Sequence, residues 1–220
     1  MTTSFASLPI VDLSILSQED PSPSALNVLS KKLYNVLSTT GFAYLVNSPV
    51  TYTHEEVFGL ASNLFNLPDH GKWRLAKKTF NPENSNTYRG SFPPQLGHSN
   101  NLKEGFEIGS PSAQSTKPPT KSQQVNLAEP NVWPEKGHFS FASRHHLESL
   151  HTQLQALSSH LLALLARSLD KPSDHFAHYL TNSLSTLRLL HYPPQTMSHS
   201  REDDMEASLC CTPHTDSGLL

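Results

Sequence analysis

Cysteine, glycine and charge are all scarce in this chain of 220 residues. Its two cysteines, Cys210 and Cys211, are adjacent, which excludes a disulfide framework and favours a reducing compartment. Charged residues make up only 16% of the chain, and the formal net charge of −3 gives no general attraction to nucleic acid or to an anionic membrane. We therefore expect neither nucleic acid nor a membrane as a partner.

Long apolar runs are also missing. The longest uninterrupted run, Leu161–Ala166, is far too short to cross a bilayer. No basic residue precedes Lys31, and Pro9 and Asp12 interrupt the early apolar stretch, so the N-terminus does not resemble a signal peptide. These observations predict a soluble cytoplasmic protein.

The first 70 residues favour short strands that alternate with capped helices. Residues 8–13 and 41–47 have the apolar and β-branched composition of strands. Between them, Ser22 and Pro23 are typical of a helix start, and Gly41 is typical of a helix end. Thr53 and Glu56 form a capping-box pattern that predicts a second helix, which Pro68 ends.

The helical periodicity fades between residues 77 and 134, where only residues 103–109 have the composition of a strand. A long amphipathic helix is expected from about Phe139 to Leu169, with a shorter helix after Ser173. Residues 187–192 alternate in the manner of a strand. We expect a single leucine stripe to bury the long helix against strands; it comprises Leu147, Leu150, Leu154, Leu157, Leu161 and Leu164.

His214 and Asp216 are the strongest candidates for chemistry. In an extended strand, residues i and i+2 point to the same face, so this imidazole and this carboxylate can reach one metal ion. One His, one Asp and a further His form the ligand set of non-haem iron(II) oxygenases. A triplet of this kind also arises by chance, so it needs supporting context.

That context is a series of landmark segments in a fixed order. Together they resemble the iron(II)/2-oxoglutarate-dependent oxygenases of the isopenicillin N synthase-like type, although Ser48-Pro49 stands where that family usually has His-Gly. The matching segments are residues 8–14, 41–47, 58–72, 88–90, 103–109, 131–134, 187–194 and 213–220.

The resemblance implies an α+β fold with two parts. Residues 1–135 would form the N-terminal region of a non-haem dioxygenase. Residues 136–220 would begin the oxygenase domain, whose core is a double-stranded β-helix, a jelly-roll-like barrel that is incomplete here and is braced by the long helix.

The resemblance also implies a site. His214 and Asp216 would bind iron(II), and Tyr192 would help to position 2-oxoglutarate, the cosubstrate used together with dioxygen. Tyr88 and Arg89 would line the pocket for a small organic substrate that is hydroxylated or desaturated, although a purely structural turn explains this segment equally well.

In that family the third iron ligand, a second His, and an Arg that grips 2-oxoglutarate come from later strands. No histidine follows Asp216, so we expect a chain truncated after the metal strand and inactive by itself. Two alternatives stay open: an isopenicillin N synthase-like oxidase that does not use 2-oxoglutarate, and a non-catalytic remnant. The sequence leaves the oligomeric state open.

Overall fold

The computed structural model describes residues 8–94, 102–111, 129–135, 137, 139–180, 185–194 and 215. The chain divides into two compact units that interrupt each other in sequence. Unit 1 combines Met1–Thr51 with Thr152–Ser183, and unit 2 combines Tyr52–His151 with Leu184–Leu220. From the sequence we expected a family N-terminal region over residues 1–135 and the start of the oxygenase domain over residues 136–220. This division into family regions stays a prediction.

Unit 1 begins with two short parallel strands and the helix between them. Strand β1 (Ile10–Asp12) pairs with β2 (Tyr44–Val46), and a 3-10 turn, η1 (Ser14–Ser17), leads toward helix α1 (Pro23–Thr39). The Ser22 hydroxyl caps α1 by accepting a hydrogen bond from the Ala25 N–H, and Gly41 follows the helix with φ of 77°. The strand, cap and helix predictions for this region are confirmed.

The core of unit 1 joins segments that are far apart in sequence. Apolar side chains of β1 and α1 pack against the C-terminal half of helix α4 (Phe141–Ser168). Inside this core, the Ser30 hydroxyl donates a 2.6 Å hydrogen bond to the Leu164 carbonyl oxygen. The short helix α5 (Ala177–Leu180), which we expected after Ser173, also belongs to this unit.

Unit 2 opens with two helices. Helix α2 (His54–Phe65) begins at the predicted capping box, in which Thr53 and Glu56 bond each other reciprocally. The prediction that Pro68 ends a helix holds only in part. Helix α2 already ends at Phe65, and Pro68 occupies the N-cap position of a further helix, α3 (Asp69–Leu75), which we had not expected.

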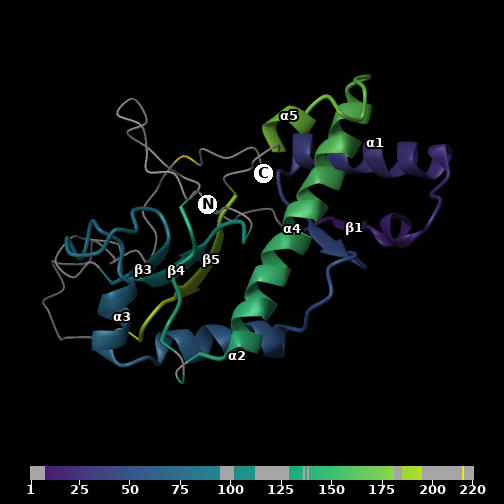
Figure 1. Ribbon diagram of the computed structural model, residues 1–220. Helices are drawn as coiled ribbons and strands as arrows, with labels where there is room; N and C mark the ends of the chain where they lie inside the picture. The colour runs from purple at the N-terminus through teal and green to yellow at the C-terminus, as the bar shows by residue number, and fades with distance from the viewer. Residues whose placement is uncertain are drawn as a thin grey trace, which may run out of the picture. The chain divides into compact units, whose positions relative to one another are not determined.

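The sheet of unit 2 is antiparallel, with β4 (Glu104–Ile108) between β3 (Gly90–Phe92) and β5 (Leu187–His191), as Figure 1 shows. Strands β4 and β5 were expected from their composition. One face of the sheet packs on the helices, because Phe106 and Leu189, which are paired across the strands, share a core with Leu64 of α2 and Leu147 of α4.

The long helix also confirms its prediction, since α4 spans Phe141–Ser168 and its leucine stripe is buried or half-buried. The stripe does not pack on strands throughout. Leu147 is fully buried against β4 and β5, whereas Leu157 and Leu164 pack largely against α1. The helix therefore contributes its two ends to two different cores.

The described residues form an α+β structure, as expected. Their strands make one two-stranded and one three-stranded sheet. The complete barrel stays a prediction. Within the described part of the chain, no helix has the length and apolar character needed to cross a membrane.

Candidate functional site

The two predicted iron ligands, His214 and Asp216, lie outside the described residues. Their expected placement on one face of a strand therefore stays a prediction. Across the residues that are described, no group of three or more His, Cys, Asp or Glu side chains is arranged to hold a metal ion.

Tyr192, the predicted 2-oxoglutarate residue, directly follows β5 and is 44% exposed. Along β5, Leu189 is buried toward the helices, whereas Arg188 and Leu190 are exposed. Because side chains alternate between the two faces of a strand, continuing this pattern by one residue assigns Tyr192 to the face away from the helices. The strand thus presents the tyrosine on the face opposite the helices.

The carboxylate of Glu104 holds β5 in place beside β4. It accepts a 2.8 Å hydrogen bond from Nδ1 of His191, the residue before Tyr192. Its other oxygen lies 2.9 Å from the ammonium nitrogen of Lys72 on α3. Glu104 is 8% exposed, so this carboxylate is largely removed from water and satisfied by these two partners.

Glu107 makes a second bridge on the opposite face of β4. It accepts a 2.5 Å hydrogen bond from Nε of Arg188 on β5, and it also pairs with Lys77, which follows α3. Because the two glutamates lie three residues apart on one strand, they point to opposite faces of the sheet, and each of them bonds a residue of β5.

Tyr88 and Arg89, the predicted substrate residues, belong to a tightly held turn before β3. The Glu129 carboxylate accepts backbone hydrogen bonds of 2.9, 2.5 and 2.6 Å from Thr87, Tyr88 and Arg89. Tyr88 is half-buried. The loop segment that contains Glu129 therefore sets the conformation of this turn.

The Arg89 side chain crosses to the start of β5. It is 3% exposed, and its Nη1 donates a 2.8 Å hydrogen bond to the Thr186 hydroxyl. Burial lowers the pKa of the guanidinium from its ordinary value, while the charges of Glu129 and Glu107 oppose that shift. This arrangement gives Arg89 a structural function, and contact with a substrate stays a prediction for both Tyr88 and Arg89.

Several residues in these networks were not singled out from the sequence. Lys72 and Glu104 stand 32 positions apart, and Glu104 and His191 stand 87 apart, so no local pattern pairs them. The only signal was weak: two acidic residues, Glu104 and Glu107, lie in an otherwise strand-like segment. Buried acids in a strand need cationic partners, and that requirement was the available clue.

More than half of the chain matches a known protein family. The model of a family described as "non-haem dioxygenase in morphine synthesis N-terminal" matches residues 8–136. The chain belongs to this family. This places it in the iron(II)/2-oxoglutarate oxygenase superfamily, as its landmark segments predicted. Iron(II), 2-oxoglutarate and dioxygen, the expected cofactors, are those of this superfamily.

Several curated relatives of this dioxygenase-family chain match it at low identity. It is 28% identical over 208 residues to proline hydroxylase buaE of Petromyces alliaceus, an alignment that covers 90% of this chain and 58% of the relative. Identity to 2-oxoglutarate-dependent dioxygenase frbJ of a Dothideomycetidae species is 26%, covering 86% and 49%. Isopenicillin N synthase of Penicillium rubens is 30% identical over 161 residues, covering 70% and 46%.

A solved structure of similar fold is that of a full-length Neurospora crassa protein in complex with alpha-KG. The TM-score is 0.68 at 22% identity, and the match covers 88% of this chain and 56% of the other. At this identity the likeness shows the fold alone. The present chain spans about half to two thirds of the length of the relatives that it matches.

Proposed function

We propose that the protein to which these residues belong is an iron(II)- and 2-oxoglutarate-dependent oxidoreductase that hydroxylates or desaturates a small organic substrate. One observation carries the proposal. Relatives that are named 2-oxoglutarate-dependent dioxygenases align with 86% and 97% of this chain, in which the predicted metal motif follows the other landmarks in the expected order.

His214 and Asp216 would hold the metal. An imidazole and a carboxylate are ligand types that suit iron(II), so these two side chains fit the ion. Bound together with 2-oxoglutarate and dioxygen, iron supplies the oxidising power to remove hydrogen from a C–H bond. The family takes its further His and Arg from later strands, and both are part of this proposal.

The described residues would serve the site by positioning. The Tyr192 hydroxyl can donate a hydrogen bond to a carboxylate of 2-oxoglutarate. Glu104 and Glu107 fix β5 against β4, and β5 ends one residue before this tyrosine. Hydrogen-bonded residues behind a binding group hold that group in a fixed position and orientation, which catalysis requires.

The test uses the protein at its natural length, supplied with iron(II), ascorbate and 2-oxoglutarate, with succinate as the measured product. We expect iron-dependent succinate that Asp216→Ala abolishes and that Asp174→Ala, a matched change at an exposed position, leaves unchanged. Tyr192→Phe should raise the KM for 2-oxoglutarate severalfold with a smaller effect on kcat. Succinate formation that survives both iron removal and Asp216→Ala would refute the proposal.

The match to isopenicillin N synthase favours a second candidate, an oxidase that uses iron and dioxygen without 2-oxoglutarate. The same assay separates the two. Oxygen consumption that needs iron and Asp216 but produces no succinate would support the oxidase.

A further inference from the structure

The three-stranded sheet of unit 2 has one face that does not pack on the helices. Leu189 of β5 belongs to the core on the helix side. Arg188, Leu190 and Tyr192 alternate with it and therefore lie on the opposite face, together with Glu107, the partner of Arg188 in the register of β4 and β5. We call this side of the sheet the second face. The Arg188 side chain is 52% exposed and Leu190 is 39% exposed, so a ligand can reach both.

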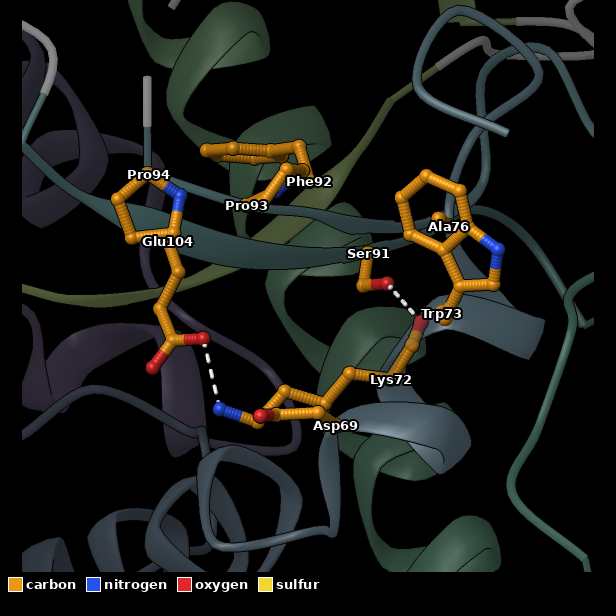
Figure 2. Close-up of a pocket in the computed structure, with 9 residues that line it drawn as sticks. All are labelled: Asp69, Lys72, Trp73, Ala76, Ser91, Phe92, Pro93, Pro94 and Glu104. Atoms are coloured by element: carbon orange, nitrogen blue, oxygen red, sulfur yellow. Dashed lines mark hydrogen bonds and ion pairs between the residues drawn. The ribbon is translucent and has the colours of Figure 1, made fainter. Parts of the chain in front are cut away.

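The helix side of the sheet is unfavourable for an anion. A cavity of about 370 Å³ lies there, between α3 and the strands β3 and β4 (Figure 2). Its lining contains the carboxylates of Asp69 and Glu104 but a single ammonium group, that of Lys72, which already lies 2.9 Å from Glu104. An anion in this cavity would therefore meet a net negative charge.

The second face has the opposite balance of charge. The Glu107 side chain is nearly buried and pairs with both Lys77 and Arg188, so two cations share one carboxylate. The charge of Arg89 also interacts with Glu107, but Glu129 offsets it. A net positive charge remains among these five residues. The second face therefore favours an anionic ligand.

Arg188 has the hydrogen-bond donors that a carboxylate requires. Its 2.5 Å bond to Glu107 uses the Nε–H. A guanidinium group has five N–H donors in a planar fork, so the N–H groups of the two Nη atoms are further donors. Two parallel N–H groups of an arginine can bind both oxygens of one carboxylate. Because Glu107 already holds the guanidinium in place, less conformational freedom is lost when a ligand binds.

An apolar strip lies beside Arg188 on the second face. Leu190 pairs with Gly105 of β4, and Gly105 pairs with Phe92 of β3. A Cβ at Gly105 would lie 2.2 Å from the Phe92 ring, so this ring covers the glycine on the second face. Side chains on one face of a strand follow each other at roughly 7 Å. A small acid that reaches Arg188 with its carboxylate can therefore lay its apolar part on Leu190 and Phe92.

We propose that Arg188 binds a carboxylate of the organic substrate, whose apolar part lies on Leu190 and Phe92. This proposal rests on the proposed oxygenase function and makes the substrate a small carboxylic acid. The cosubstrate 2-oxoglutarate is a second source of carboxylates near β5. Its predicted residue, Tyr192, stands four positions after Arg188, or roughly 13 Å along an extended strand. The experiment therefore has to distinguish the substrate from the cosubstrate.

The test uses the protein at its natural length, loaded with iron(II) and saturating 2-oxoglutarate under nitrogen. Turnover then stops for lack of dioxygen, and the cosubstrate fills its own site. Phenylacetate, phenylacetamide and phenethylammonium have similar shapes and differ in charge, and each is titrated by isothermal calorimetry. We expect phenylacetate to bind roughly tenfold more tightly than the other two, because hydrogen bonds between charged groups are the strong ones.

Two arginine variants form the matched comparison. Arg188→Met should weaken phenylacetate binding roughly tenfold, because it removes the charged donor, and should leave the affinities for phenylacetamide and 2-oxoglutarate unchanged. Arg74→Met makes the same change at an arginine that is 64% exposed and also pairs with a glutamate, and it should alter none of the three affinities. If Arg188→Met disturbs the fold, Leu190→Glu replaces it. That variant adds a negative charge beside Arg188 at an exposed position, and the same loss is expected.

Three results would overturn the proposal. The first is that phenylacetate fails to bind, or binds no more tightly than phenylacetamide. The second is an equal loss of affinity for phenylacetate and phenylacetamide in Arg188→Met, which would give the arginine a purely structural function. The third is phenylacetate binding only when 2-oxoglutarate is omitted, together with a loss of 2-oxoglutarate affinity in Arg188→Met, which would assign the carboxylate to the cosubstrate. Failure of the oxygenase function would be seen separately, as the absence of iron-dependent succinate from the wild-type protein.

Discussion

The Glu104 carboxylate on β4 accepts a 2.8 Å hydrogen bond from His191 at the end of β5. The same carboxylate pairs with Lys72 of α3. One largely buried acid therefore joins three elements at the point where the chain enters Tyr192. Its removal should affect both the stability of unit 2 and the order of the residues that follow β5.

Glu104→Gln keeps the shape of the side chain but removes its charge. We expect the free energy of unfolding to fall by about 1–3 kcal/mol, because hydrogen bonds to charged groups contribute about that much. Urea denaturation measures the change. Glu135→Gln removes an acid from the highly exposed pair with Arg74 and should alter stability by less than about 0.5 kcal/mol. Equal effects of the two variants would contradict the structural importance of Glu104.

Gly90→Ala should destabilise the chain by at least about 2 kcal/mol. The φ of Gly90 is 100°, where an L side chain costs about 1–3 kcal/mol, and an added Cβ would lie 2.2 Å from the Leu75 carbonyl oxygen. Gly59 is helical and has open space around it, so Gly59→Ala should instead stabilise by roughly 0.5–1 kcal/mol. Thermal unfolding of both variants tests the contrast in sign.

Glu56 should make stability depend on pH in the acid range. Hydrogen bonds from the Thr53 hydroxyl and the Thr53 N–H lower the pKa of Glu56 below its ordinary value of 4.5. A carboxyl whose pKa is lower in the folded state stabilises the protein above the unfolded pKa and loses this contribution as pH falls through the folded pKa. The wild-type chain should therefore exceed Glu56→Gln in stability at pH 7, and the difference should shrink as the pH falls through the lowered pKa of Glu56. Glu55→Gln removes the same charge one residue away in the first turn of α2, so it controls for the loss of charge alone.

The 220-residue chain by itself should form no iron-dependent succinate. His214 and Asp216 supply two ligands, and an incomplete ligand set holds a metal weakly. Iron titration should accordingly show weak binding that Asp216→Ala weakens further. Iron-dependent turnover by the isolated chain that is lost in Asp216→Ala would contradict this prediction and would mean that another residue or a second chain completes the site.

Local signals in the sequence predicted much of the fold because they act within a few residues. Ser22 and the Thr53–Glu56 box begin their helices as expected, because a cap satisfies N–H groups only two or three positions away. The leucine spacing of α4 likewise predicted a buried stripe.

Two kinds of feature escaped prediction: a very short helix and contacts between distant residues. Helix α3 is only seven residues long and lies directly after a proline, so its sequence shows little helical periodicity. The Glu129 carboxylate accepts hydrogen bonds from the backbone of Tyr88 and Arg89, which stand 41 and 40 positions before it in the sequence. Histidine and aspartate spacing pointed to an iron site, yet the described structure contributes the supporting residues around Tyr192 rather than the ligands themselves.

The sharing of α4 between the two units has a consequence for synthesis. The Ser30 hydroxyl finds its acceptor on Leu164, 134 residues later in the chain. On a ribosome, β1 and α1 emerge first but must wait, with Leu29 and Leu33 uncovered, until the far half of α4 has left the exit tunnel. The core of unit 1 therefore forms late, although β1 and α1 are synthesised first. Until then, the apolar side chains of α1 offer a binding surface to chaperones that shield nascent chains.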